Sequence, residues 1–187
     1  MLTLLGIPGA LRAASTNRIL LAEARLAFGE ATHTEANLRL PLYDGDLEDR
    51  DGIPPEVQAL ADQIAAADAV VIATPEYNKS FPGVLKNALD WVSRIKGNPW
   101  KDKPLAIIGA ADGREGGARA SFALRLAMTP FRPRMLTGPE VQVANSRQAF
   151  DAEGRLIDER YVKALSTLME DLHAEVRRST EPLSRTA

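Results

Sequence analysis

Three continuous apolar runs constrain the fold of this chain more than any other feature of its sequence. They are Leu2–Ile7, Ala69–Thr74 and Leu105–Ala110, and aliphatic residues dominate each of them. A strand with one solvent-exposed face alternates apolar and polar residues, whereas a strand buried on both faces has a continuous apolar sequence. The runs therefore predict the central strands of a parallel sheet. Weaker patterns indicate two more strands, at Ala36–Leu40 and Val141–Ala144.

Helical patterns separate these strands along the chain. We expect helices over about 17–27 with Asn17 as the cap, 55–67, 82–95, 118–128 and 158–178. Strands and helices thus alternate, which predicts a doubly wound α/β fold with helices on both faces of the sheet. Residues 1–178 are expected to form a single domain, and residues 179–187 a flexible tail. Ligands of such folds bind beyond the carboxyl ends of the strands, so the loops 8–17, 75–82 and 111–117 form the candidate site.

The composition excludes several classes of protein. The formal net charge is -2 and the sequence pI is about 5.8, which gives no basic surface for nucleic acid. The chain has no apolar run long enough to span a bilayer and no basic start typical of a signal peptide. It contains no cysteine, which excludes disulfides, thiolate nucleophiles and thiolate metal sites. We therefore expect a cytoplasmic protein with no metal, no nucleic acid and no membrane among its partners.

The loop after the first strand, "IPGALRAASTNR", has the arrangement of an anion site, in which a strand, a turn and a polar segment precede a helix. It carries neither the Gly-Lys-Ser/Thr of a Walker loop nor the glycine spacing of a dinucleotide fingerprint. Residues 1–22 also lack the acidic side chains of a receiver domain. A terminal phosphate remains, held by Arg12 with Ser15, Thr16 and Asn17. An ordinary helix cap beside a surface arginine is the equally open alternative.

The loop after the middle strand, within "TPEYNKSFPGVLKNALDW", is more specific. Pro75 removes a backbone donor and fixes φ, so the chain leaves the sheet in an extended form. Glu76, Tyr77 and Asn78 then cross the carboxyl end of the sheet and offer backbone groups to the edge of a flat heterocycle. Pro82 and Gly83 turn the chain into the next helix.

Taken together, "PGALRAASTNR", "TPEYNKSFPGVLKNALDW" and "GGAR" resemble the NADPH-dependent FMN reductase family of flavodoxin-like proteins, and within it the quinone and chromate reductases. The resemblance covers nearly the whole chain, including "PLYDGD" and "FDAEGRLIDE". It implies a five-stranded parallel sheet of order 2-1-3-4-5, bound FMN, and NAD(P)H as the hydride donor. It also implies a homodimer or homotetramer, with the helix that carries Trp91 contributing to the interface.

The resemblance carries over to particular residues of this chain. Arg12, Ser15 and Asn17, with backbone from Ala10, Leu11 and Thr16, would hold the phosphate; Pro75, Glu76, Tyr77 and Asn78 would line the isoalloxazine; Ala110, Gly116 and Gly117 would close its other side. The chain departs from the family at Ala10, Ala110 and Ala111, where hydroxyl residues are common, and at Lys79, where an aromatic residue is frequent. The first three departures remove hydroxyls near the cofactor, and Lys79 stands beside the open face of the ring.

The implied reaction passes a hydride from NAD(P)H to FMN and then electrons to an acceptor, in a ping-pong scheme. Quinones, flavins, chromate and azo compounds are the expected acceptors. No acid–base residue is assigned, because the flavin carries the chemistry and the sequence has no convincing catalytic triad. Glu76 is expected to fix its loop or pair across subunits, and Trp91 to pack. Two other classes stay open, an electron-carrying flavodoxin and a binding protein without turnover.

Overall fold

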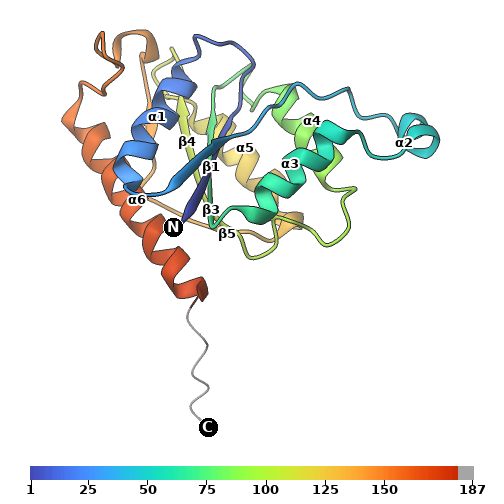
Figure 1. Ribbon diagram of the computed structural model, residues 1–187. Coiled ribbons are helices and arrows are strands. Elements are labelled where there is room, and N and C mark those ends of the chain that lie inside the picture. The colour runs from blue at the N-terminus through green and yellow to red at the C-terminus, as the bar shows by residue number, and fades with distance from the viewer. Residues whose placement is uncertain (181–187) are drawn as a thin grey trace.

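The computed structural model describes residues 1–180. In this part of the chain, strands and helices alternate (Figure 1). The strands are β1 (Thr3–Pro8), β2 (Thr32–Glu35), β3 (Ala69–Thr74), β4 (Pro104–Ala110), β5 (Arg134–Met135) and β6 (Gln142–Val143). The helices are α1 (Thr16–Phe28), α2 (Gly45–Asp51), α3 (Pro55–Ala66), α4 (Gly83–Val92), α5 (Ala118–Met128) and α6 (Glu159–Thr180), with short 3-10 helices η1 (Thr129–Phe131) and η2 (Ser146–Gln148).

The strands form one sheet in which every pairing is parallel. The order is β2-β1-β3-β4-β5, and β6 also pairs with β4. This arrangement confirms the predicted flavodoxin-like order and the doubly wound α/β class. Because all strands point the same way, the loops that follow them gather at one edge of the sheet.

Helices cover both faces of the sheet, with α1 and α6 on one side and α3, α4 and α5 on the other (Figure 1). Successive strand residues alternate between the two layers. Val71 and Ile108 pack in the cluster formed with α1 and α6, whereas Ile72 and Ile107 pack in the cluster formed with α3, α4 and α5. The unbroken apolar runs of the sequence follow directly from this double burial.

The strand predicted at 36–40 is wrong, because β2 lies just before it, at Thr32–Glu35. This edge strand is half exposed, so its sequence carries no apolar run. Its register with β1 pairs Thr3 with Thr32 and Gly6 with Glu35. Ala36 and Leu38 are buried after the strand has ended, and they pack in the α3–α4 layer. Because Ala36 and Leu38 are alternate apolar residues, the sequence showed the period-2 pattern of a strand where the chain forms none.

Two short strands share the far side of β4. β5 pairs with its beginning, at Pro104 and Leu105, and β6 pairs with its end, at Gly109 and Ala110. The strand predicted at 141–144 contains β6, whereas β5 was not predicted. The second short strand matters for the site, because it brings residues 144–148 to the carboxyl edge of the sheet.

Most predicted helices are confirmed with small shifts at their ends. Helix α5 has the predicted bounds, and α3 ends one residue early. Asn17 does not cap α1; the cap is Ser15, whose hydroxyl accepts the amide of Asn17 at 3.3 Å. Helix α6 continues to Thr180, so residues 179 and 180 of the expected flexible tail are helical. The rest of that tail, residues 181–187, lies outside the described residues.

Helix α2 was not predicted, and its segment projects from the body beyond α3 and α4 (Figure 1). Asn87 of α4 holds the base of the projection, since its side chain accepts the amide of Tyr43 at 2.8 Å. Trp91 is fully buried beneath it and donates its indole N–H to the carbonyl of Pro41 at 2.8 Å. Trp91 thus packs within its own chain, and its buried ring is not available to pack against a partner subunit in the way that the predicted interface on this helix would suggest.

Candidate functional site

A cleft of about 570 Å³ lies at the carboxyl edge of the sheet. Its walls come from the loops that follow β1, β3, β4 and β6. The lining residues are Arg12, Ala14, Ser15, Thr16, Asn17, Pro75, Glu76, Tyr77, Ala110, Ala111, Asp112, Ser146 and Arg147. Of the residues expected to contact a cofactor, Ala10, Leu11, Asn78, Gly116 and Gly117 do not line this cleft. The three predicted loops therefore meet around one cavity, with a fourth loop beside them.

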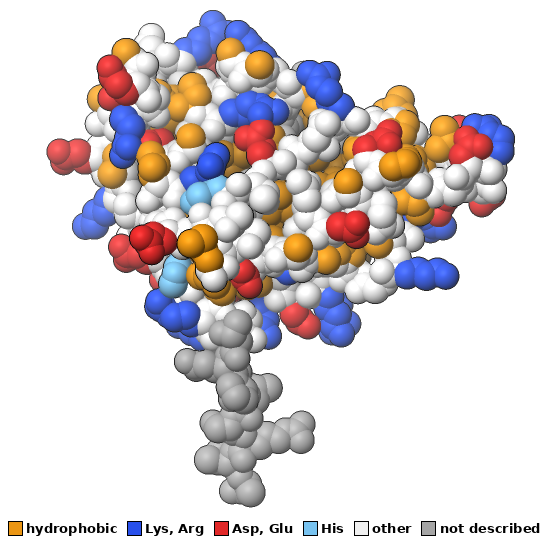
Figure 2. All heavy atoms as spheres, viewed as in Figure 1, with side chains coloured by type: hydrophobic (Ala, Val, Ile, Leu, Met, Phe, Trp, Pro, Cys, Tyr) orange, Lys and Arg blue, Asp and Glu red, His pale blue; other side chains and the backbone are white. Residues whose placement is uncertain are grey.

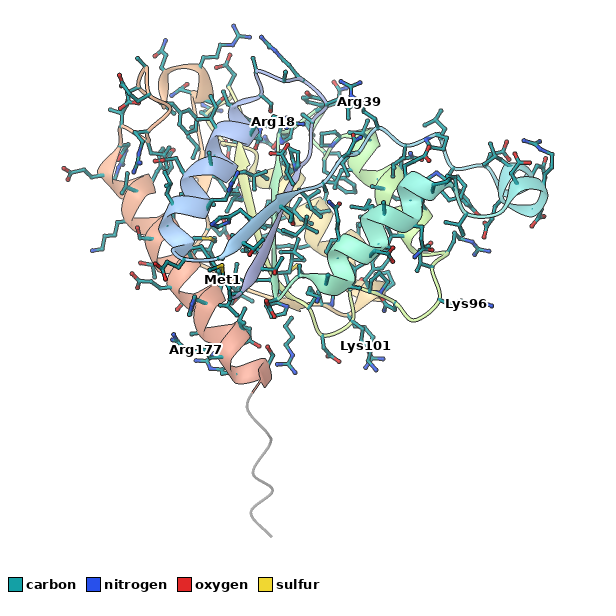
Figure 3. The ribbon with its side chains drawn as sticks, in the orientation of Figure 1. Met1, Arg18, Arg39, Lys96, Lys101 and Arg177 are labelled. Atoms are coloured by element: carbon teal, nitrogen blue, oxygen red, sulfur yellow. The ribbon has the colours of Figure 1, made fainter. Side chains whose placement is uncertain are left out.

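The first loop runs close against the end of β3. Gly9 donates its amide to the carbonyl of Ala73 at 2.7 Å, and a Cβ at position 9 would lie only 2.9 Å from that oxygen. Ala10 is buried just after it. Arg39, which lies at the carboxyl edge of the sheet (Figure 3), donates a hydrogen bond from its guanidinium to the carbonyl of Leu11 at 3.4 Å. The loop is thus held from below by the sheet and from outside by one arginine.

Asn17 fastens the start of α1 to the end of β4. Its side-chain amide donates to the carbonyl of Ala110 at 2.8 Å, and its side-chain oxygen accepts the amide of Ala110 at 2.9 Å. The side chain is buried, and both of its polar ends are engaged in these two bonds. Asn17 therefore positions the loop with its side-chain oxygen and one of its two side-chain N–H donors, and the second N–H is left over.

The groups that remain available in the first loop are donors. Within residues 1–180, the guanidinium of Arg12 has no ion pair, and the amides of Arg12, Ala13, Ala14 and Thr16 donate no hydrogen bond. The hydroxyl of Ser15 accepts from Asn17 and keeps its own proton free to donate. These groups stand at the N-terminus of α1, where the helix dipole favours an anion.

The second loop is fixed by an ion pair at its first turn. Glu76 accepts the backbone amide of Arg119 at 3.1 Å and its guanidinium at 3.2 Å. The carboxylate is mostly covered, with 13% of the side chain exposed, and it stands at the N-terminal end of α5. This supports the expectation that Glu76 fixes its loop, and the pair forms within one subunit. Tyr77, which follows, is 53% exposed and lines the cleft.

A tight turn carries the second loop away from the cleft. Tyr77 and Ser80 exchange backbone hydrogen bonds at 2.8 and 3.1 Å. The two residues between them are left-handed, with φ of 51° at Asn78 and 66° at Lys79. This is the conformation of a type I′ turn, which glycine and asparagine adopt readily and lysine does not. The turn therefore presents Lys79 on the surface at some conformational cost.

The third loop packs against β6. Gly116 has φ of 60°, and a Cβ there would lie 2.2 Å from the carbonyl oxygen of Gln142. This glycine permits a close approach between two segments of the protein. At the other end of the loop, Asp112 lines the cleft and pairs with Arg147 at 3.1 Å. The amide of Ser146 donates to the carbonyl of Ala111 at 3.2 Å, which fastens the fourth loop to the third.

Sequence reasoning missed Ser146 and Arg147. The available signal was the predicted strand at 141–144, because any loop that follows a parallel strand reaches the same edge of the sheet. The histidines stand elsewhere, as expected: His33 is in edge strand β2 and His173 packs against Phe28. Within residues 1–180, no group of three or more His, Cys, Asp or Glu side chains is placed to hold a metal ion. No helix in this part of the chain is long and apolar enough to cross a membrane.

A second cavity, of about 400 Å³, lies between α4 and η1. Its walls include Leu89 and Phe131, and none of the loops at the carboxyl edge contributes to it. Of these two cavities, the first stands where doubly wound sheets place their ligands. On the face seen in Figure 2, basic and acidic side chains are interspersed.

The donor set of the first cleft fits FMN. One end offers a guanidinium, free hydroxyls and unpaired amides to a phosphate, and the other end offers Pro75, Glu76 and Tyr77 to a flat ring. The cleft volume lies within the range of small-molecule sites. The three alanines noted in the sequence remove hydroxyls but leave these donors in place.

Comparisons with known proteins point the same way. Residues 2–149 match the family described as NADPH-dependent FMN reductase. An NAD(P)H-dependent FMN reductase of Pseudomonas aeruginosa is 42% identical over 176 residues, which cover 93% of this chain and 95% of that protein. A quinone reductase of Escherichia coli K12 is 42% identical over 121 residues, 64% of each chain.

Among solved structures, the fold is similar to FerB, a flavoenzyme NAD(P)H:(acceptor) oxidoreductase from Paracoccus denitrificans. The TM-score is 0.85 at 32% sequence identity, and the match covers 95% of this chain and 98% of that one. These matches confirm the resemblance drawn from the sequence motifs. The chain belongs to the NADPH-dependent FMN reductase family, and is accordingly an oxidoreductase of flavodoxin-like fold that works with FMN and NAD(P)H.

Proposed function

We propose that this protein binds FMN in the cleft at the carboxyl edge and reduces quinones and related small molecules at the expense of NAD(P)H. When bound, FMN supplies the redox chemistry, taking a hydride from the nicotinamide and passing electrons to the acceptor in a separate half-reaction. The observation that carries the proposal is the pairing of an anion-binding loop with the extended Pro75–Tyr77 segment around one cleft.

The residues of the chain act by binding and positioning. Arg12 and the free amides of the first loop would hold the phosphate, with the hydroxyls of Ser15 and Thr16 beside them. Asn17 would keep this loop in register with β4. Glu76 would hold the second loop at the edge of the ring through Arg119. None of these residues is assigned a role as a proton donor or acceptor in the reaction.

The acceptor would approach over the exposed second loop. Quinones are favoured, because a quinone reductase is among the relatives at 42% identity and "2-hydroxy-1,4-benzoquinone reductase" of a Burkholderia species is another. Flavins, chromate and azo compounds belong to the same proposal, since they accept electrons from an open ring face without a dedicated binding group. Lys79 would influence the choice among them from its exposed turn.

Two observations on purified protein test the proposal. The protein should be yellow, or become so on addition of FMN, and NADPH or NADH should bleach the colour without oxygen. Re-oxidation by a benzoquinone should then restore it, with parallel lines in steady-state plots of a ping-pong scheme. A protein that cannot be loaded with FMN would rule out the enzyme. Bound flavin that neither nicotinamide bleaches would favour an electron carrier.

We also propose that the protein forms a homo-oligomer and is located in the cytoplasm. A homodimer or homotetramer is supported by Phe122 and Leu126, which lie one turn apart on α5 and are 57% and 73% exposed. Light scattering on the purified protein would measure the assembly, and a monomeric mass would contradict this part. A cytoplasmic location follows from the supply of NAD(P)H, and cell fractionation would check it.

A further inference from the structure

Two guanidinium groups line the cleft, and they differ in their partners. Arg12 has no ion pair within residues 1–180, whereas Arg147 pairs with Asp112 at 3.1 Å. The other carboxylate of the cleft, Glu76, is engaged by Arg119 outside it. Among the described lining residues, Asp112 and Arg147 therefore form the one ion pair in which both partners line the cleft.

Hydrogen bonds connect Arg147 to the loop that would hold the phosphate. Asn17 bonds both backbone groups of Ala110 at 2.8 and 2.9 Å. The next residue, Ala111, accepts the amide of Ser146 at 3.2 Å. Arg147 follows Ser146 directly, so the same strand end fixes the first loop and the base of this arginine. Arg12 and Arg147 thus line one cleft from two loops that are fastened to the same strand end.

Ser146 adds a second polar group at this place. The residue is 4% exposed and lines the cleft. Within residues 1–180, its hydroxyl makes no hydrogen bond. The hydroxyl is therefore available to donate to, or accept from, a ligand in the cleft. The fourth loop therefore offers a cation and a neighbouring hydroxyl to the cleft.

We propose that Arg147 is the second cation for the phosphate of bound FMN, and that Asp112 holds its place until the phosphate arrives. This inference rests on the proposed function, because it takes FMN as the ligand of the cleft. A phosphate monoester carries about 1.5 to 2 negative charges at neutral pH, and Arg12 neutralises only one of them. Arg147 balances the remainder, in a chain that lacks a hydroxyl at Ala10.

The exchange of partners costs little. The side chains of Arg147 and Asp112 are 80% and 53% exposed, and an ion pair so exposed contributes little to stability. A guanidinium makes stronger, paired bonds to a phosphate. The arginine would therefore leave the carboxylate for the phosphate and return when the cofactor dissociates.

The test compares FMN with riboflavin, which has the same ring and no phosphate. Both flavins are titrated into apoprotein, and the dissociation constants are read from flavin fluorescence. Arg147→Gln should weaken FMN binding by roughly five- to tenfold and leave riboflavin binding unchanged. Arg114→Gln is the matched control, because Arg114 is 94% exposed on the neighbouring loop and does not line the cleft. It removes the same charge and should change neither constant.

Asp112→Asn tests the exchange itself. Loss of the competing carboxylate should strengthen FMN binding by about twofold and leave riboflavin unchanged. Weaker FMN binding in Asp112→Asn would overturn the exchange, and equal losses for both flavins in Arg147→Gln would overturn the phosphate contact. An Arg147→Gln effect no larger than that of Arg114→Gln would do the same. Wild-type protein that binds neither flavin would overturn the proposed function, and this inference with it.

Discussion

The two ends of the cleft are built by different kinds of interaction. At the phosphate end, Asn17 makes two neutral hydrogen bonds to Ala110 in the buried interior. At the ring end, Glu76 pairs with Arg119, half of whose side chain is exposed, and an exposed turn follows at once. One end is therefore fixed to the core of the sheet, and the other is fixed to the start of a surface helix.

This difference separates two tasks. Buried polar bonds rigidify a structure, because breaking them leaves unsatisfied groups away from water. An ion pair with one half-exposed partner is weaker and adjusts more readily. The phosphate end thus suits the retention of one cofactor, whereas the ring end suits a succession of different substrates.

Replacement of Asn17 by alanine should damage the fixed end most. The substitution leaves the amide and carbonyl of Ala110 without partners, at a cost of about 3 kcal/mol in the free energy of unfolding. Asn37→Ala is the control, since Asn37 is exposed and its side chain accepts only the nearby amide of Arg39. Urea denaturation of both variants measures the difference. Equal stability losses would show that the bonds of Asn17 do not anchor the loop.

Replacement of Arg12 by alanine should affect cofactor binding alone. The loss of a charged hydrogen bond of about 1.5–3 kcal/mol predicts FMN binding that is weaker by roughly ten- to a hundredfold. The free energy of unfolding of the apoprotein should not change, because Arg12 is exposed and unpaired within residues 1–180. Titrations with FMN and riboflavin measure the effect, and riboflavin binding should persist. Unaltered FMN affinity would remove Arg12 from the phosphate site.

The fold and the position of the cleft could be predicted because buried parallel strands leave a strong record in the sequence. The runs at 2–7, 69–74 and 105–110 coincide closely with β1, β3 and β4, and topology then brings their following loops together. The outer strands of the sheet have weaker sequence patterns. β2 is half exposed and β5 has two residues, so neither continuous apolarity nor alternation marks them, and only a weak pattern at 141–144 marked β6.

The finer structure of the site depends on contacts that no local pattern encodes. Asn17 was predicted as a helix cap, the commonest role of asparagine before a helix, yet its partner Ala110 lies 93 residues away. Arg147 belongs to a loop that enters the cleft only because β6 pairs with the end of β4. In both cases a tertiary contact decides what the side chain does.

Replacement of Glu76 by glutamine should loosen the adjustable end without unfolding it. The pair with Arg119 contributes about 0.2–1 kcal/mol, and glutamine can still accept the amide of that residue. We expect the KM for a quinone to rise more than the dissociation constant of FMN. Arg119→Gln and the double variant complete a double-mutant cycle. In this cycle the effect of the double variant on the KM for the quinone should be smaller than the sum of the two single effects. Additive losses would show that the two residues act separately.

The smallest and most selective effect is expected at Lys79, where the side chain and the backbone can be tested apart. Lys79→Tyr should change the ratio of kcat/KM between a bulky and a small quinone by roughly threefold or more, with FMN affinity unaltered. Lys79→Gly removes the side chain and relieves the left-handed backbone, for which φ is 66°. It should stabilise the protein by about 1 kcal/mol. If the tyrosine variant changed FMN affinity and left the acceptor ratio alone, Lys79 would belong to the cofactor end, and the division between a fixed and an adjustable end would fail at this residue.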